Sequence, residues 1–263
     1  MAIDPAVAEI FAAIQRDDPG LTNDQFGSLP AASQYRRLYE LAGRHAGPGD
    51  RVLDWGCGRG HFSYALVRRG CRVTAYSLEH APEIFSALSP DERSRLRFVQ
   101  GAPGATSALP FADGEFSAAF SVGVLEHVRE TGGDELASLR ELRRVLAPGG
   151  ALVCYHLPNR YSYIEAASRL LRGAGGGSAW DGCHRYRFTK QDIRRLCSEA
   201  RLRVEELGRY GFLPRNSFNR LPAFLRRSRS LAAAVDASDS LLERLFSPVV
   251  QNYYFVARAE SVA

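Results

Sequence analysis

The stretch Arg51-Val-Leu-Asp-Trp-Gly-Cys-Gly-Arg-Gly60 decides the fold, because a short apolar run meets an acid and then three alternating glycines. A strand, a tight glycine turn and a following helix form the first half of a nucleotide-binding βαβ unit. Glycine suits such a turn because side chains forbid its backbone angles and because a ligand must approach the main chain closely. The glycines read G-x-G-x-G, and His61 stands where a dinucleotide fingerprint has its third glycine.

Asp54 lies directly before this turn. A carboxylate at that point repels the pyrophosphate of a dinucleotide, whereas it suits a cationic ammonium group. The turn therefore favours a nucleoside that carries an amino acid over a nucleoside that carries phosphates.

The turn resembles motif I of the class I S-adenosylmethionine-dependent methyltransferases, and the resemblance covers roughly residues 35–207. The order and the intervals of several further segments carry it. These segments are Leu109-Pro-Phe111, Phe116, Leu125-Glu-His-Val128, Arg144-Val-Leu-Ala-Pro-Gly-Gly150, His156-Leu-Pro-Asn159 and a late helix opened by Phe188-Thr189.

Alternating strands and helices predict an α/β fold with a doubly wound, mainly parallel sheet. After the strand at Arg51, the expected strands are 72–78, 97–100, 118–122 and 151–157; a helix marked by Leu136 to Leu146 is expected to stop at Pro148-Gly149-Gly150. Residues 203–207 and 252–257 suggest two more, which form an antiparallel edge pair in the resembled family and complete a seven-stranded Rossmann-like sheet. The expected organisation is an N-terminal helical extension (1–34), a cofactor-binding methyltransferase domain (35–210 and 248–263) and substrate-lid or insert segments (160–187 and 211–247).

Composition narrows the class of protein. Hydrophobic residues make up 45% of 263 residues, and no apolar run approaches the ~20 residues that span a bilayer. The N-terminus lacks the features of a signal peptide, and the five cysteines show no CxxC pairing, so we expect reduced thiols in a cytoplasmic protein. Lys190 is the single lysine, so 33 of the 34 basic residues are arginine, which looks like a codon-usage imprint. We therefore do not expect the net charge of +5 to indicate a nucleic-acid partner.

The resemblance implies S-adenosyl-L-methionine as the cofactor and distributes its contacts along the chain. Asp54 would accept hydrogen bonds from the ammonium group, and Ser121 to Gly123 would pass beside the sulfonium. The glycine turn would lie under the methionine portion, through Gly56, Cys57, Gly58 and Gly60.

The expected ribose and adenine contacts depart from the family pattern. The acid that usually accepts both ribose hydroxyls falls on Ser77, with Glu79 two residues later. Either Ser77 and Leu78 line the ribose, or a local shift brings Glu79 into reach, because residues two apart on a strand share a face. Gly101-Ala102 replaces the common Gly-Asp, so adenine would contact backbone groups and apolar side chains from Ala102, Leu109 and Phe111.

Methyl transfer from a sulfonium is an in-line displacement, and a hydroxyl acceptor must also lose its proton. The candidate bases are His127 with Glu126 beside it, His156 and His184. His127 alternatively begins a helix and bonds to the backbone. Ubiquinone-pathway O-methyltransferases carry a further glutamate, which supports a divalent metal, where this chain has Gly123, so we expect no metal site.

The leading hypothesis is methyl transfer to a small-molecule, glycan or lipid-linked acceptor, most simply at oxygen. The alternatives are an RNA or protein methyltransferase and a non-catalytic protein that binds the cofactor. The segment 215–229 holds five arginines and no acid, so it is either a contact with anionic lipid or a solvated helix face. Gly173 to Ser178 suggests the hinge of a mobile loop, and Arg201 stands where the family has a helix-closing glycine. The sequence leaves the oligomeric state open.

Overall fold

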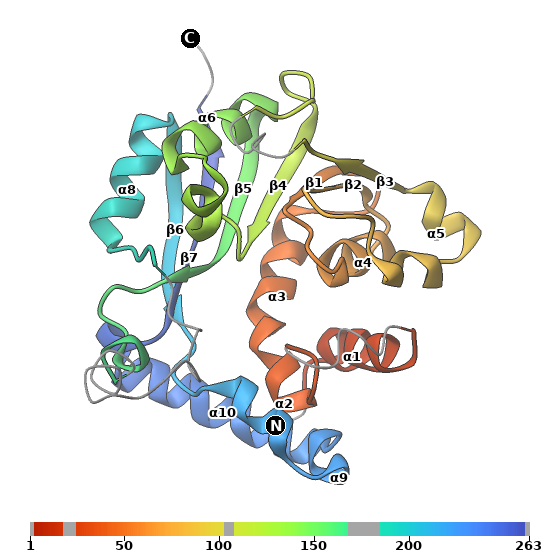
Figure 1. Ribbon diagram of the computed structural model, residues 1–263, viewed down its shortest axis with the longest axis vertical. Helices are drawn as coiled ribbons and strands as arrows, with labels where there is room; N and C mark the ends of the chain where they lie inside the picture. The colour runs from red at the N-terminus through yellow and green to blue at the C-terminus, as the bar shows by residue number, and fades with distance from the viewer. Residues whose placement is uncertain (1–2, 18–24, 103–107, 168–184, 261–263) are drawn as a thin grey trace. The chain divides into compact units, whose positions relative to one another are not determined.

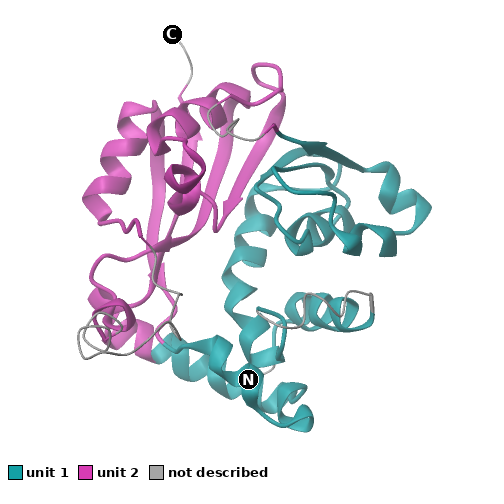
Figure 2. Ribbon diagram, in the orientation of Figure 1, with its two compact units in different colours: residues 1–101, 213–241 teal, residues 102–212, 242–263 magenta. Residues whose placement is uncertain are grey.

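The computed structural model describes residues 3–17, 25–102, 108–167 and 185–260 (Figure 1). The chain forms two compact units. Unit 1 comprises residues 1–101 and 213–241, and unit 2 comprises residues 102–212 and 242–263 (Figure 2). Both units combine strands of the sheet with flanking helices, so each is described by its own elements.

Unit 1 contains three parallel strands in which β2 lies between β1 and β3. The strands are β1 (Arg51–Trp55), β2 (Arg72–Ser77) and β3 (Leu96–Gln100). The helices are α1 (Pro5–Asp17), α2 (Leu29–Ala32), α3 (Arg36–His45), α4 (His61–Arg68), α5 (Pro90–Ser94) and α9 (Ala223–Arg226), and the 3₁₀ turns are η2 (Ser33–Tyr35), η3 (Glu83–Ala87) and η5 (Arg215–Arg220). Helix α10 (Arg229–Leu245) begins in this unit and continues into unit 2.

Unit 2 contains a mixed sheet in which β5 is parallel to β4 and antiparallel to β7, while β7 is antiparallel to β6. The strands are β4 (Phe116–Val122), β5 (Leu146–Pro158), β6 (Leu202–Tyr210) and β7 (Asn252–Ala259). The other elements are α6 (Glu135–Val145), α8 (Lys190–Glu199), η4 (Leu125–Thr131) and η6 (Ser247–Val249). The order of all seven strands is β3-β2-β1-β4-β5-β7-β6.

The sequence explains where several helices begin. Thr189 caps α8: its hydroxyl accepts from the amide of Asp192, and the Asp192 carboxylate accepts from the amide of Thr189. Asp134 caps α6 by accepting from the amide of Ala137. Such caps satisfy amides that lack a partner within the helix and contribute about 1 kcal/mol each.

The strand interiors are apolar and buried, as expected for a sheet covered on both faces. Val52 and Leu53 of β1 and Ala119 and Phe120 of β4 are fully buried. The antiparallel pair of β6 and β7 confirms the expectation of two late strands that close the sheet. The α/β prediction and the mainly parallel sheet are likewise confirmed.

Two local expectations have different outcomes. Pro148-Gly149-Gly150 does not end the preceding helix, because α6 already ends at Val145 and β5 begins at Leu146, which pairs with Phe116. The register then shifts before Ala118, so the proline and glycines form an irregularity inside the strand. Arg201, by contrast, has a φ of +56°, which confirms that the chain needs a left-handed residue after α8.

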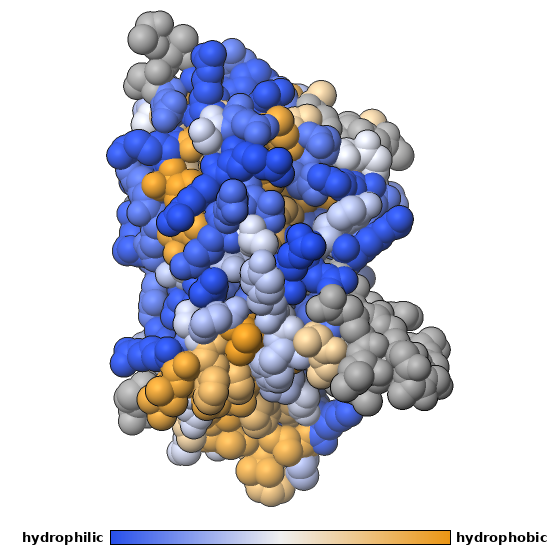
Figure 3. Space-filling view, turned by 90° about the vertical axis from the view of Figure 1, so that its left-hand side faces the viewer, coloured by the Kyte–Doolittle hydropathy of each residue, from blue (hydrophilic) through white to orange (hydrophobic). Residues whose placement is uncertain are grey.

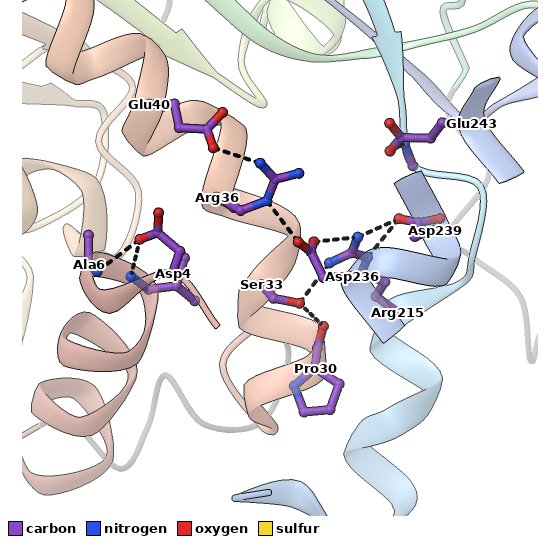
Figure 4. A network of polar contacts seen from close by, with 12 residues as sticks. Asp4, Ala6, Pro30, Ser33, Arg36, Glu40, Arg215, Asp236, Asp239 and Glu243 are labelled. Carbon is purple, nitrogen blue, oxygen red and sulfur yellow. Dashed lines mark hydrogen bonds and ion pairs between the residues drawn. The ribbon is translucent and has the colours of Figure 1, made fainter. Parts of the chain in front are cut away.

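The basic segment 215–229 is only partly a surface feature, because Arg215 is buried with 7% exposure. Its guanidinium pairs with Asp239 and with Asp236, whose second oxygen accepts from Arg36 (Figure 4). The same guanidinium donates to the Ser33 hydroxyl at 2.7 Å. Arg215 therefore joins η5, α10 and η2 inside unit 1, so this arginine belongs neither to a lipid contact nor to a solvated helix face.

The described cysteines are buried free thiols, and Cys183 lies outside the described residues. Within the described ranges, no helix is both long and apolar enough to cross a bilayer. The expected hinge at Gly173 to Ser178 also lies outside the described residues, and the expected domain and lid boundaries stay predictions.

Candidate functional site

The glycine turn after β1 has left-handed backbone angles at all three glycines. The φ values are +76° at Gly56, +48° at Gly58 and +80° at Gly60. The amides of Gly56 and Cys57 both donate to the carbonyl of Tyr76, at 2.8 and 2.9 Å. This pair of hydrogen bonds pins the turn to the end of β2 and fixes the position of the bend.

Two of these glycines are needed for different reasons. A Cβ at Gly60 would lie 2.7 Å from a ring carbon of Phe85 and 2.8 Å from the Cβ of Pro82, so packing excludes a side chain there. A Cβ at Gly58 would meet nothing within 4 Å among the described residues. The main chain at Gly58 is thus open on the side where a side chain would stand, and a ligand can approach it closely.

Asp54 lies at the end of β1 with 1% exposure. Its Oδ2 accepts the Ser63 hydroxyl at 2.6 Å, which ties β1 to the first turn of α4. Burial raises the pKa of Asp54 to about 6, against the opposing effect of hydrogen bonds from the Ser63 hydroxyl and amide. In this position Asp54 holds β1 and α4 together on either side of the glycine turn. Its contact with an ammonium group stays a prediction.

Cys57 lies within the turn and is 6% exposed. Burial, and then the charge of Asp54, raise the pKa of its thiol far above the usual range. Cys57 is therefore a neutral thiol that packs, and it lacks the electropositive surroundings that activate a nucleophilic cysteine.

The expected ribose contacts lie at the end of β2. Ser77 is 5% exposed and its hydroxyl accepts from the amide of Glu79 at 3.1 Å, whereas the Glu79 side chain is exposed. Because β2 ends at Ser77, the argument that residues two apart share a strand face does not reach Glu79. Leu78, half-buried, follows the strand directly.

The expected adenine contacts follow β3. The Gly101 amide donates to the carbonyl of Ser77 at 2.8 Å, and a side chain at Gly101 would collide with the Tyr76 hydroxyl. Ala102, the first residue of unit 2, is exposed, and residues 103–107 lie outside the described part. Unit 1 thus gathers the glycine turn, Ser77 and Gly101 around the ends of its strands.

Unit 2 gathers a second set of candidates where β4 and β5 end. Ser121 of β4 is 1% exposed and lies opposite Cys154 of β5. Gly123 follows with a φ of +69°, and a Cβ there would lie 3.8 Å from Glu126 Oε1 and 3.9 Å from the Cβ of His156. Glu126 and His156 therefore flank the same glycine.

Glu126 is a buried carboxyl group in η4, with 3% exposure. Its Oε2 has no hydrogen-bond partner among the described residues. Burial raises the pKa of Glu126 to about 8, with a bond to its own amide lowering it and the charge of Glu130 raising it. The group is therefore mostly protonated at neutral pH and gains its charge just above it.

His156 combines a strained backbone with a fixed side chain. Its φ of +72° is uncommon for a residue other than glycine, and such strain collects at functional sites. Its Nδ1 lies 2.7 Å from the Tyr210 hydroxyl, and the Tyr210 ring stacks on Tyr155 at 4.2 Å between centroids. Tyr210 belongs to β6 and reaches the cluster through the antiparallel pairing, so no local sequence signal identified it.

The two remaining catalytic candidates are His127 and His184. His127 has a side chain that is 46% exposed, and its Nδ1 lies 2.9 Å from Glu130 Oε2. His184 lies outside the described residues. Within the residues that the structure describes, no group of three or more histidine, cysteine or acidic side chains is placed to hold a metal ion.

Comparison with known proteins agrees with this geometry. Residues 53–154 match the family described as "Methyltransferase domain". The chain is 38% identical over 125 residues to a ubiquinone biosynthesis O-methyltransferase of Xanthomonas campestris pv. campestris. This match covers 44% of this chain and 46% of that protein. It is 33% identical over 132 residues to a malonyl-[acyl-carrier protein] O-methyltransferase of Serratia marcescens, covering 48% of this chain and 47% of that protein. The chain thus spans less than half the length of these relatives.

A solved structure extends the likeness of fold beyond the matched region. The 1,6-didemethyltoxoflavin-N1-methyltransferase of Burkholderia thailandensis, with bound S-adenosylhomocysteine, superposes with a TM-score of 0.57 over 97% of this chain and 88% of that chain, at 18% identity. At that identity the superposition supports the fold alone. Residues 53–154 thus match a methyltransferase domain, and the glycine turn and the strand order are similar to those of the class I S-adenosylmethionine-dependent methyltransferases.

Proposed function

We propose that this chain transfers the methyl group of S-adenosyl-L-methionine to a hydroxyl group of a small-molecule, glycan or lipid-linked acceptor. The observation that carries the proposal is the preformed glycine turn, whose main chain is open at Gly58 and closed by packing at Gly60. The names of the relatives in Xanthomonas campestris and Serratia marcescens support oxygen as the methylated atom.

The residues of unit 1 fit this cofactor by their chemistry. The main chain of Gly56 to Gly60 would lie under the methionine portion, with Asp54 holding the turn from below. Ser77 and Leu78 would line the ribose, because Glu79 lies beyond the strand end. When bound, the sulfonium supplies an electrophilic methyl group, and the protein's part is to orient the acceptor and to remove its proton.

We assign the removal of that proton to His156. With Nδ1–H donating to the Tyr210 oxygen, Nε2 keeps its lone pair and can accept a proton from the acceptor hydroxyl. Glu126, on the other side of Gly123, would donate a hydrogen bond in its protonated form and is a second candidate for the base. His127 is the weaker candidate because it lies exposed beside Glu130.

One alternative has an observation in its favour. The chain lacks the family's acids at the ribose and adenine positions, which suits a protein that binds the cofactor without catalysis. An RNA or protein methyltransferase remains the other alternative, and a cytoplasmic location remains part of the proposal.

Two alanine variants, each of which places a Cβ at a residue with positive φ, test whether the chain binds the cofactor through the glycine turn. Gly58 and Gly49 both have positive φ, and at both positions a Cβ would meet nothing within 4 Å among the described residues. Gly58→Ala and Gly49→Ala should each lose about 1 kcal/mol of stability, because a left-handed residue now carries a Cβ. Only Gly58→Ala should also weaken S-adenosylmethionine binding, measured by calorimetric titration, since its methyl group enters the ligand's side of the turn.

The titration separates the possibilities. Absence of binding by the unaltered chain to both S-adenosylmethionine and S-adenosylhomocysteine would overturn the proposal. Binding without turnover on a panel of hydroxyl acceptors with labelled methyl donor would favour the non-catalytic alternative. His156→Asn keeps a residue that tolerates positive φ, so it should bind cofactor normally and lose most of the methyl transfer.

A further inference from the structure

Helix α10 turns its carboxylates toward the interior. Asp236 and Asp239 are 8% and 1% exposed, and both pair with the buried Arg215 (Figure 4). One turn later, Glu243 accepts a hydrogen bond from the amide of Gly211 at 2.7 Å. The spacing 236, 239, 243 places all three acids on one face, so the acidic side of this helix faces inward.

The outward side of α10 is correspondingly apolar. Leu241 is 57% exposed and Leu245 is 65% exposed. Ala234 and Ser238, also exposed, lie on the same stripe by helical spacing, and none of the four side chains carries a charge. A surface helix ordinarily has the opposite arrangement, so this stripe, which we call the outer α10 stripe, indicates a surface that meets an apolar medium.

Arginines and a further exposed aromatic residue lie before this helix and at its first residue. Phe224 of α9 is 74% exposed, the largest exposure among the described large hydrophobic residues. Exposed or half-buried arginines lie around it in the chain, and none forms an ion pair within the part of the chain that the structure describes. These are Arg220, Arg226, Arg227 and Arg229.

Acidic residues are missing from this region of the sequence. The chain contains no aspartate or glutamate from residue 207 to residue 235. The next acids, Asp236 and Asp239, are withdrawn from the surface by Arg215. Figure 3 shows apolar surface gathered in the lower part of the view, and α10 lies in the lower part of Figure 1.

We propose that Phe224 and the outer α10 stripe, with the four arginines, form a docking surface for an anionic lipid bilayer. An amphipathic helix that lies in the plane of the bilayer buries its apolar stripe among the acyl chains, and neighbouring arginines bind the anionic headgroups. The sign of the charge selects the anionic leaflet, and the stretch from residue 207 to residue 235 contributes no acid that such a leaflet would repel.

A second copy of this chain fits the surface less well. A twofold interface brings the same patch of both copies together, so the arginines of one copy would face those of the other. That contact between like charges is repulsive, whereas anionic lipid headgroups attract the same arginines. The proposal is independent of methyl transfer, because nothing in it depends on the glycine turn.

Sedimentation with vesicles tests the proposal, using the full chain without cofactor. The protein should bind mixed phosphatidylcholine–phosphatidylglycerol vesicles, release at high salt, and bind pure phosphatidylcholine vesicles much more weakly. Arg227→Gln with Arg229→Gln should lower the partition coefficient about 25-fold, at about fivefold for each arginine near the surface. The matched control, Arg194→Gln with Arg195→Gln on exposed positions of α8, removes the same charge and should leave binding nearly unchanged.

The apolar contribution is tested separately. Phe224→Gln with Leu241→Gln should lower vesicle binding at least about tenfold while the melting temperature stays near that of the unaltered chain, since both side chains are exposed. Equal losses for the α8 control and for the Arg227–Arg229 double variant would overturn the proposal, and so would weak binding to anionic vesicles. A concentration-dependent dimer that Leu241→Gln abolishes would likewise overturn it and assign the stripe to a second copy.

Discussion

Replacing Glu126 by glutamine tests whether the carboxyl group between Gly123 and His156 is held protonated by burial. The pKa of Glu126 is raised from 4.5 to about 8, so between these values the folded chain keeps a proton that the unfolded chain has lost. The contribution of Glu126 to stability therefore falls as the pH rises through this window. Glutamine has nearly the same shape and cannot ionise in either state.

The size of the effect follows from the shift. The difference of 3.5 pKa units between about 8 and 4.5 corresponds to about 5 kcal/mol when both states are ionised. At pH 5 most of this cost is absent, because the unfolded carboxyl is itself partly protonated. We therefore expect Glu126→Gln to exceed the unaltered chain in unfolding free energy by about 1 kcal/mol at pH 5 and by about 4 kcal/mol at pH 8.

Urea unfolding of both proteins across pH 5 to 8 measures this difference in unfolding free energy. Other groups that titrate, such as Asp54, are present in both proteins, so their contributions cancel in the difference. Glu199→Gln, an exposed substitution on α8, is the control and should follow the unaltered chain at every pH. A Glu126→Gln curve parallel to that of the unaltered chain would show that the carboxyl is not held neutral, and the reasoning from burial would fail. If Glu126 also donates to the acceptor, as proposed, the stabilised variant should keep methyl transfer, because the glutamine amide also donates.

Three further substitutions follow from single contacts. Arg201→Gly should raise the unfolding free energy by about 1 kcal/mol because φ is +56°, whereas Arg201→Ala, which keeps a Cβ, should not; thermal unfolding distinguishes them. Arg215→Leu should destabilise by about 3–5 kcal/mol in urea, since it removes the guanidinium that pairs with two buried aspartates, while the exposed Arg220→Gln should change stability by less than about 0.5 kcal/mol. Tyr210→Phe should shift the pH profile of methyl transfer and leave S-adenosylmethionine affinity unchanged, because it removes the bond to His156 Nδ1; a profile identical to that of the unaltered chain would exclude Tyr210 as a positioning residue.

Local patterns were sufficient for the glycine turn, the existence of the strands and the start of α8. The turn at Gly56 to Gly60 can be recognised in the sequence because positive φ restricts the residue type. The cap at Thr189 can be recognised because a cap involves residues only three positions apart. The left-handed position at Arg201 is another example, because it was recognised from the residue type that the family has there. These features depend on neighbours in the chain, which a sequence displays directly.

The tertiary structure alone decided which side of α10 is covered and which residues surround His156. An amphipathic pattern marks two faces of a helix but does not say which of them is buried, and in α10 the buried acids pair with Arg215, a residue from another element. Tyr210 meets His156 only because β6 pairs with β7 and β7 with β5. His156 and Tyr210 are 54 positions apart, and Arg215 pairs with acids 21 and 24 positions away. The burial that raises the pKa of Glu126 and holds Arg215 inside exists only once the chain has folded.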